Sequence, residues 1–341
     1  MKASLLIQAL QCKNFSRPPV WFMRQAGRHL ESYRKLRGRY SFLELCHEPD
    51  LITEVSLLPI KAYQVDAAIL FSDILLVVEA MGLKIQFQDS QGPLIEKPLE
   101  NGFSVASLPL PVDLSGLTCI QKGVEQLKKT LNIPLIGFAG APFTLASYMI
   151  EGKTNRETSK TKRWIYADPE SFHSLLDKLA DWVAASLLIQ IRAGADAVQL
   201  FDSWANALTP AHFRLFCLPY LRKVMHLIRV SYPHVPILLF CRNSALFAPL
   251  LAEPSPQGIS LDWSCSVKET RKQLGPSIAL QGNLDPHLLY APLSQIKKEA
   301  NLLLDSMSGD PGYIFNLGHG ILPDVSEEAV RTLVECVKER N

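Results

Sequence analysis

Long apolar runs and an excess of charge of one sign are both missing from this chain of 341 residues. A membrane-spanning helix needs about 18 consecutive apolar residues, and even the apolar stretch from Trp182 to Ile189 is followed at once by Gln190. The 35 basic residues face 33 acidic ones, so the net charge is only +2. Because nucleic acids and acidic membranes attract strongly basic proteins, we expect neither as a partner. An anionic ligand would have to be met by a local cluster of basic residues.

Paired cysteines, export signals and the common cofactor motifs are missing as well. The seven cysteines are scattered and form no CxxC pair, which predicts reduced thiols in a cytoplasmic protein. Residues 5–10 are too short an apolar stretch for a secretory signal, so we expect no export. No histidine begins an H-x-C or H-E-x-x-H pattern, and the chain has no GxGxxG, P-loop or G-x-S-x-G segment. Metal, nucleotide and nucleophilic-serine mechanisms therefore have little support.

The sequence does contain a regular alternation of short apolar runs and longer amphipathic stretches. Parallel strands joined by helical crossovers give this pattern, because such strands are buried on both faces. The stretches 172–193 and 293–306 carry apolar residues at three- and four-residue spacing, which predicts helices. Eight strand–helix units predict a TIM barrel, a (β/α)8 fold, and an open doubly wound sheet is the alternative. The eight apolar runs are 19–23, 67–71, 134–138, 197–201, 236–240, 258–261, 277–280 and 312–315.

One segment departs from the alternation of strands and helices. Residues 83–98 alternate apolar and polar side chains around the segment Asp89-Ser90-Gln91-Gly92, which predicts an inserted β-hairpin after the second strand. Proline-containing stretches at 108–113 and 253–258 have neither the length nor the composition of interdomain linkers. We therefore expect residues 1–341 to form a single catalytic barrel domain.

Polar residues follow the predicted strands directly, and the carboxyl ends of barrel strands are where active sites form. Arg24 and Arg28 follow the first run and begin the strongest positive cluster, which extends to Arg39. If this segment is helical, both guanidinium groups share one face and can bind carboxylates or phosphates. The alternative is a solvated basic helix without a ligand. Asp73 follows the second run, where it either binds a ligand, acts as a base or caps the next helix. His319 stands between two glycines, which favours a ligand contact.

Seven blocks of the sequence, taken in order, resemble those of the uroporphyrinogen decarboxylase family. The segment PVWFMRQAGR at 19–28 closely resembles the N-terminal signature of that family, and Tyr33-Arg34 follow shortly after it. The resemblance extends from Pro19 to the C-terminus, so it is far more specific than any single motif. The other blocks are AILFSDIL at 68–75, GFAGAPFTL at 137–145, YMIEG at 148–152, FDSWA at 201–205, QGNLDP at 281–286 and NLGHG at 316–320.

The resemblance implies a homodimeric (β/α)8 barrel that removes CO2 from the four acetate side chains of uroporphyrinogen III. The product is coproporphyrinogen III, and the reaction is a step of heme biosynthesis that needs no cofactor. Arg24 and Arg28 match the family's substrate arginines, which suits a substrate with eight carboxylates. Asp73 matches an aspartate that would accept hydrogen bonds from the pyrrole N–H groups and stabilise a cationic ring. Asp73 and Arg24 are thus the expected catalytic residues, with the proton donor unassigned because guanidinium is a poor acid. The other implied substrate contacts are Gln25, Ala26, Gly27, Tyr148, Ser203 and His319.

Two segments depart from the family pattern near the expected mouth of the barrel. Residues 241–247 read CRNSALF where the family usually has a glycine-rich segment, and Asn206 replaces a customary glycine. Both departures bear on loop conformation and substrate affinity.

Three other functions are the alternatives. The first is a cobamide-dependent methyltransferase, a relative with the same barrel. That group is similar to zinc enzymes that use an H-x-C motif, and this chain lacks the motif. A carrier of an acidic tetrapyrrole has no evident need for Asp73. An RNA-binding protein would interleave aromatic residues with its basic cluster, and residues 24–39 do not show that arrangement.

Overall fold

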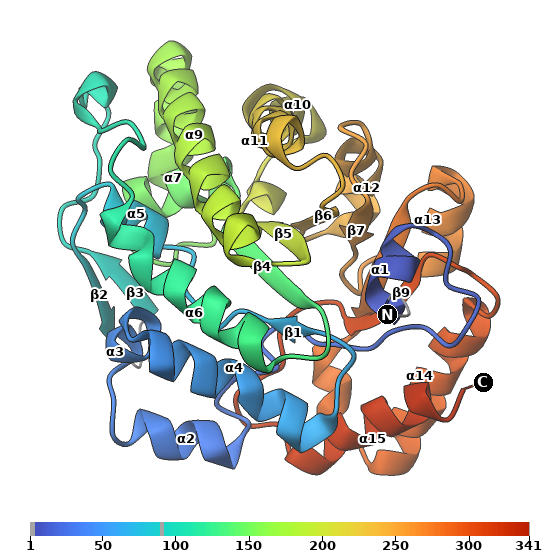
Figure 1. Ribbon diagram of the computed structural model, residues 1–341. Helices are drawn as coiled ribbons and strands as arrows, with labels where there is room; N and C mark the ends of the chain where they lie inside the picture. Colours follow the sequence, from blue (N-terminus) through green and yellow to red (C-terminus); the bar gives the residue numbers. More distant parts are fainter. Residues whose placement is uncertain (1–3, 89–91, 341) are drawn as a thin grey trace.

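Seven parallel strands form one curled sheet in a computed structural model that describes residues 4–88 and 92–340. The strand order is β1-β4-β5-β6-β7-β8-β9, so each strand pairs with its neighbour along the chain once the separate hairpin is set aside. Helices surround the sheet on the outside (Figure 1). The sheet strands are β1 (Ala68–Ile69), β4 (Leu135–Gly140), β5 (Ala197–Asp202), β6 (Ile237–Cys241), β7 (Gly258–Ser260), β8 (Ala279–Leu284) and β9 (Tyr313–Leu317).

The segment around Val20 occupies the eighth position of the barrel wall, between β9 and β1. Val20 forms a parallel bridge with Phe315 of β9, and the Phe315 N–H donates to the Pro19 carbonyl at 2.9 Å. On the other side the Asp66 N–H donates to the Val20 carbonyl at 2.8 Å. The predicted (β/α)8 class is therefore confirmed and the open sheet is wrong. The first predicted run forms only an isolated bridge, because few of its backbone groups pair with either neighbour.

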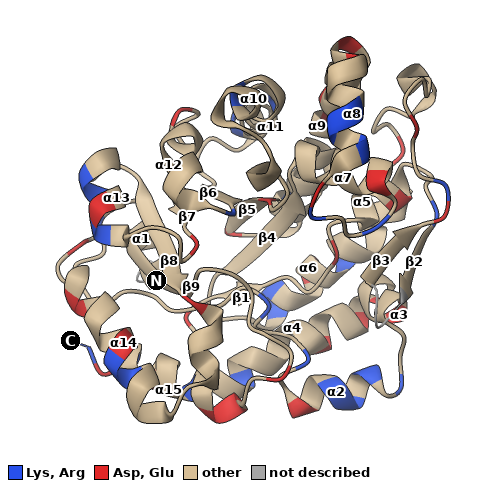
Figure 2. Cartoon of the chain, turned by 180° about the vertical axis from the view of Figure 1, so that it is seen from behind, with Lys and Arg blue, Asp and Glu red and all other residues tan. Residues whose placement is uncertain are grey.

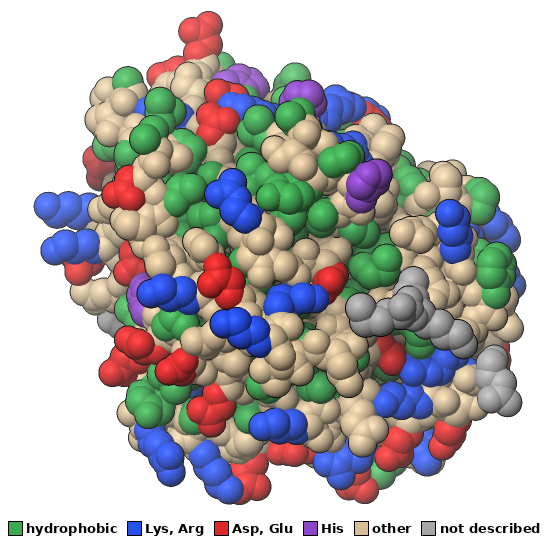
Figure 3. Space-filling view, viewed as in Figure 1, with side chains coloured by type: hydrophobic (Ala, Val, Ile, Leu, Met, Phe, Trp, Pro, Cys, Tyr) green, Lys and Arg blue, Asp and Glu red, His purple; other side chains and the backbone are tan. Residues whose placement is uncertain are grey.

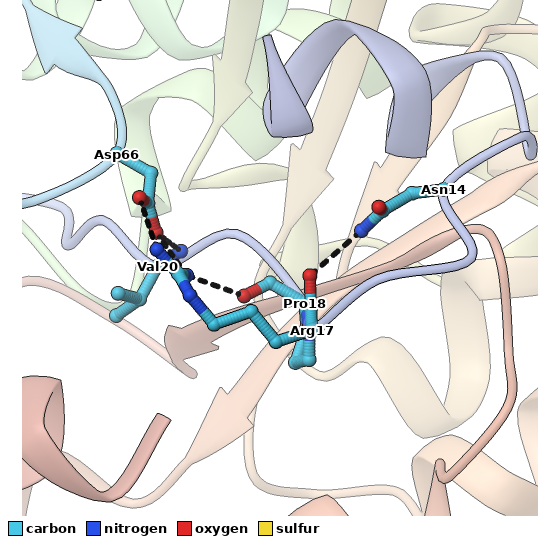
Figure 4. Close-up of polar contacts among 5 residues, drawn as sticks. All are labelled: Asn14, Arg17, Pro18, Val20 and Asp66. Carbon is cyan, nitrogen blue, oxygen red and sulfur yellow. Dashed lines mark hydrogen bonds and ion pairs between the residues drawn. The ribbon is translucent and has the colours of Figure 1, made fainter. Parts of the chain in front are cut away.

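An ion pair between Arg17 and Asp66 holds this closing segment in place (Figure 4). Both terminal nitrogens of Arg17 donate to the Asp66 carboxylate, at 2.7 and 2.8 Å, and the Val20 N–H donates to the same carboxylate at 2.8 Å. The Asn14 side chain donates to the Arg17 carbonyl at 2.8 Å. The two charged side chains are 18% and 15% exposed, a setting in which each charge needs the other. The pair thus ties the N-terminal segment to the residues before β1.

The helices pack their apolar faces against the barrel wall. The longest, α9 (Pro169–Ala193), begins where the Asp168 side chain accepts from the Ser171 N–H and ends at Gly194 with a φ of +119°. Both predicted helices are confirmed, although α9 begins three residues before the expected start because Asp168 caps it. No helix of the described residues is long and apolar enough to cross a membrane.

The other α-helices are α1 (Leu5–Leu10), α2 (Glu31–Arg37), α3 (Phe42–His47), α4 (Pro49–Tyr63), α5 (Leu76–Ala80), α6 (Thr118–Thr130), α7 (Pro142–Glu151), α8 (Ser159–Ala167), α10 (Pro210–Phe216), α11 (Leu218–Ser231), α12 (Ser244–Ala252), α13 (Val267–Leu274), α14 (Leu293–Ser306) and α15 (Glu327–Lys338). Short 3-10 helices are η1 (Val105–Ser107), η2 (Ser115–Leu117), η3 (Ala205–Ala207) and η4 (Pro286–Tyr290).

A β-hairpin follows α5, as predicted. Its strands β2 (Ile85–Gln88) and β3 (Gly92–Ile95) pair antiparallel, with Gln88 opposite Gly92. The predicted turn residues 89–91 lie outside the described residues. The ring of Phe87 packs on that of Phe42 with centroids 4.6 Å apart, which joins the hairpin to α3. The hairpin therefore lies beside the barrel mouth and supplies part of the wall described next.

Candidate active site

A cavity of about 620 Å³ opens at the carboxyl ends of the barrel strands. Its lining comes from the segments after Val20, β1, β4, β5, β6 and β9 and from the hairpin. The rings of Phe138, Phe201 and Phe240 form a row along three adjacent strands, with neighbouring centroids 5.8 Å apart. A cavity of this size with aromatic walls suits a ligand with a flat or rounded apolar body.

The segment that carries Arg24 and Arg28 is a loop, so the predicted helical spacing of these two residues is wrong. Arg24 has a φ of +59°, and helix α2 begins only at Glu31. Gly27 helps the tight turn, since a Cβ there would lie 2.9 Å from the Arg24 carbonyl oxygen. Both arginines nevertheless line the cavity, together with Ala26 and Gly27. They reach it because the chain turns inward at the end of a barrel segment, and α2 with its own charged residues lies farther out (Figure 2).

Gln25 is the exception among the predicted contacts, because its side chain does not line the cavity. The side chain is fully buried. It accepts from the Phe22 N–H at 3.0 Å and donates to the Ala67 carbonyl at 3.1 Å. These two bonds tie the arginine loop to the start of β1 and hold Arg24 and Arg28 at the mouth.

Several arginines that line the cavity form no ion pair with a described residue, although Asp73 lies in the same cavity. Elsewhere in the barrel, poorly exposed arginines are paired, as Arg17 is with Asp66 and Arg271 with Asp310. The space-filling view shows both signs of charge interspersed over one face of the molecule, in keeping with the net charge of +2 (Figure 3). Uncompensated arginines in a cavity favour an anionic ligand. The cavity arginines whose guanidinium groups form no ion pair or hydrogen bond with another described residue are Arg24, Arg28, Arg156 and Arg242.

Asp73 is the acidic residue among the described residues that line the cavity. Its Oδ1 accepts from the Leu75 N–H at 2.8 Å, which forms a local turn; helix α5 itself has no side-chain cap. Burial raises the pKa of Asp73 from 3.8 to about 6, and the Leu75 N–H and the charge of Arg24 oppose the rise. At pH 7 the side chain is therefore mostly a carboxylate, and its partial burial makes that charge unfavourable.

Tyr148, Ser203 and His319 line other parts of the cavity wall as uncharged groups. Burial raises the pKa of Tyr148, whose ring meets that of Trp204 edge-on at 5.9 Å. Ser203 directly follows β5. Burial lowers the pKa of His319 to about 3, and the nearby charges of Arg24 and then Arg242 lower it further. His319 is thus a neutral imidazole at pH 7, able to exchange hydrogen bonds but not to supply charge.

Sequence reasoning missed Arg156 and Arg242 as cavity residues. Arg242 directly follows β6, and the rule that placed Arg24 and Asp73 at strand ends would have found it. Arg156 lies in the loop between α7 and α8, where no such rule applies. Asn206, one of the two departures from the family pattern, does not line the cavity. Among the described residues, no three His, Cys, Asp or Glu side chains come together as a possible metal site.

Comparison with known proteins assigns the family. A family model described as uroporphyrinogen decarboxylase (URO-D) matches residues 1–340. The chain belongs to the uroporphyrinogen decarboxylase family. A relative named uroporphyrinogen decarboxylase from Protochlamydia amoebophila (strain UWE25) is 58% identical over 335 residues, which cover 98% of this chain and 91% of the relative. One of the same name from Roseiflexus sp. (strain RS-1) is 41% identical over 344 residues, which cover 99% of each chain.

Solved structures share the barrel of this uroporphyrinogen decarboxylase family member. A methyltransferase from Methanosarcina mazei superimposes with a TM-score of 0.84 at 20% identity, covering 99% of both chains. A B12-independent methionine synthase from Shewanella sp. W3-18-1 gives a TM-score of 0.55 at 12% identity. Identities this low show the common fold alone, and chemistry is decided by the residues in the cavity.

Proposed function

We propose that this chain is a uroporphyrinogen decarboxylase, which converts the four acetate side chains of uroporphyrinogen III to methyl groups and releases coproporphyrinogen III and CO2. The observation that carries the proposal is the set of arginines without an ion pair that line the same cavity as the Asp73 carboxylate. The substrate has carboxylates around its rim, an apolar ring body and N–H groups at its centre. Arginines, aromatic walls and Asp73 complement these three features in turn.

Asp73 accepts hydrogen bonds from the pyrrole N–H groups and stabilises positive charge on the ring. Protonation of a pyrrole carbon beside the acetate makes that ring cationic. The bond to the carboxylate then breaks, its electron pair moves into the ring, and CO2 leaves. The exocyclic carbon then takes up a proton and the ring carbon gives back the proton it had gained. One net proton thus replaces each CO2, and the side chain ends as a methyl group. The ring takes up the electrons itself, and for this reason we propose a reaction without a cofactor.

Arg24 and Arg28 bind substrate carboxylates, with Ala26 and Gly27 forming the loop surface beside them. Arg24 lies near the reacting ring and stabilises the carboxylate there before CO2 forms. We assign the proton to a water or a substrate carboxyl, because a guanidinium is a poor acid even where burial lowers its pKa, as it does for Arg24. Tyr148, Ser203 and His319 exchange hydrogen bonds with the substrate as neutral groups, and Gln25 acts by fixing the arginine loop.

The assembly and location of the enzyme belong to the same proposal. Residues 1–341 act as one catalytic domain, two copies form a homodimer, and the protein works in the cytoplasm. Free cysteines support a reducing compartment. Sedimentation equilibrium tests the homodimer, and a mass of one chain at micromolar concentration would contradict it.

The decisive experiment is anaerobic incubation of the purified protein, with a chelator present, and chemically reduced uroporphyrinogen III. After oxidation, chromatography separates the porphyrins by their number of carboxylates. We expect intermediates with seven, six and five carboxylates and then the product with four. Binding without any loss of carboxylates would make the chain a tetrapyrrole carrier or an inactive relative. Loss of activity on addition of the chelator would contradict the cofactor-free reaction.

A further inference from the structure

The loop after β6 brings a further arginine to the cavity, on the side opposite Arg24. Arg242 directly follows β6 and lines the cavity. In the barrel wall β6 is the fourth position from Val20 in either direction, so the segments after Val20 and β6 face each other across the mouth. Arg24 and Arg242 therefore approach the same cavity from opposite walls.

Asp262, which follows β7, fixes the conformation of the loop that carries Arg242. The buried Asp262 carboxylate accepts from the Asn243 N–H at 2.5 Å and from the Ser244 N–H at 3.1 Å. The Ser244 hydroxyl returns a bond to the Cys241 carbonyl at 3.2 Å and accepts from the Asp262 N–H at 2.8 Å. Asn243 has a φ of +59°, a conformation that asparagine tolerates better than most residues, and it lies in the segment where the family usually is glycine-rich. The loop is thus held at both ends of Arg242.

The charge of Arg242 is directed to the cavity and is not neutralised by the described residues. Asp262 uses its oxygens on the loop backbone and on Ser264, and it forms no ion pair with Arg242. The half-buried guanidinium has no hydrogen bond to any other described residue either. Its charge reaches the interior, since it contributes to the lowered pKa values of both His319 and Arg24. A fixed, uncompensated cation on a cavity wall is a site for an anionic group of the ligand.

We infer that Arg242 binds a carboxylate of the substrate on the edge of the macrocycle opposite the edge held by Arg24 and Arg28. This inference rests on the proposed function and adds a binding residue that the family resemblance does not supply. A ligand with carboxylates on every side needs cations on opposite walls. A carboxylate held against Phe201 and Phe240 would lose its hydrating water, and without a cation nothing would offset that cost. Arg242 thereby sets the affinity and the orientation of the ring and does not take part in the bond-breaking step.

The test compares Arg242→Gln and Arg242→Lys with the wild-type enzyme in initial-rate assays of uroporphyrinogen III. Arg222→Gln is the matched control, because Arg222 lies on α11, is half exposed and pairs with Glu253 away from the cavity. We expect Arg242→Gln to raise KM at least tenfold, which corresponds to about 1.4 kcal/mol of binding, with kcat within about threefold of wild type. Arg242→Lys keeps the charge and should recover part of the affinity. Arg222→Gln should leave KM unchanged.

The experiment distinguishes failure of the inference about Arg242 from failure of the proposed function. A wild-type protein that does not convert uroporphyrinogen III contradicts the proposed function. An active wild type together with an unchanged KM for Arg242→Gln overturns only the role of Arg242. A fall in kcat with no change in KM, unrelieved by Arg242→Lys, also overturns it, because that result describes a loop that has lost its structure and not a lost carboxylate contact.

Discussion

Replacing Asp73 with asparagine should abolish most turnover and, at the same time, stabilise the fold above pH 6. The substitution removes the carboxylate from the cavity and preserves the shape of the side chain. An asparagine Oδ1 can still accept from the Leu75 N–H, as Asp73 does at 2.8 Å. The loop after β1 should therefore keep its conformation, so that the substitution tests charge alone.

The stability gain follows from the pKa of Asp73, which burial raises from 3.8 to about 6. Each pH unit of such a difference corresponds to about 1.4 kcal/mol, so the ionised side chain costs the fold up to about 3 kcal/mol above pH 6. Solvent in the open cavity reduces this cost, and we expect Asp73→Asn to gain about 1 to 3 kcal/mol at pH 8. The gain should fade as the pH falls from about 6 to 3.8, because the carboxyl is then protonated first in the folded state and finally in both states.

Two assays check the prediction on the same protein preparations. Urea unfolding at pH 8 and pH 4.5 measures the free energy of unfolding, and the advantage of Asp73→Asn at pH 4.5 should be less than half its value at pH 8. Turnover of uroporphyrinogen III at pH 7.5 should fall by about 100- to 1,000-fold, the usual cost of removing a group aimed at transition-state charge. Wild-type kcat/KM should also fall below pH 6, as Asp73 takes up a proton.

Either half of the result can refute the reasoning. Turnover of Asp73→Asn within about threefold of wild type would remove Asp73 from the chemistry. A variant less stable than wild type at pH 8 would show that the carboxylate makes interactions which outweigh its burial. A variant that is both more stable and inactive would mark Asp73 as a residue kept for function at a cost to the fold.

Two further substitutions and one titration test the neighbouring parts of the molecule. Gly320→Ala would bring a Cβ to 2.3 Å from the Arg24 Cδ and 2.5 Å from its Cγ, so Arg24 must move; KM should rise at least about fivefold and the urea midpoint should fall. An unaltered KM would show that the position of Arg24 does not matter. Asp66→Asn leaves Arg17 poorly exposed without its charge partner and should lower the free energy of unfolding by about 2 to 4 kcal/mol in urea, with kcat nearly unchanged; a loss under 1 kcal/mol would contradict the role of the pair in closing the barrel. His319, with a pKa of about 3, should show no ring protonation by NMR between pH 8 and 5, and a titration near 6.5 would mean that its surroundings are wetter than described.

Most of the barrel could be read from local patterns in the sequence. Apolar runs between amphipathic stretches mark buried strands and their crossovers, because side-chain hydrophobicity repeats with the period of each element. The helix at 293–306 was predicted to the residue, and the hairpin was predicted where strands β2 and β3 pair. Asp73 and His319 were singled out by their places after strands or between glycines, and parallel strands bring such positions to one end of a barrel.

What the sequence by itself determined, then, is the order of the elements, the family and the residues that stand at strand ends. Only the tertiary structure decided that Gln25 turns inward to hold its loop, that Arg24 has a left-handed conformation and is not on a helix, and that the loop of Arg242 lies across the mouth from that of Arg24. The physical reason is that these outcomes depend on partners far away in the chain. Closure of the barrel beside Val20 determines which loops lie opposite each other across the mouth. The local periodicity of the sequence carries no information about such pairings.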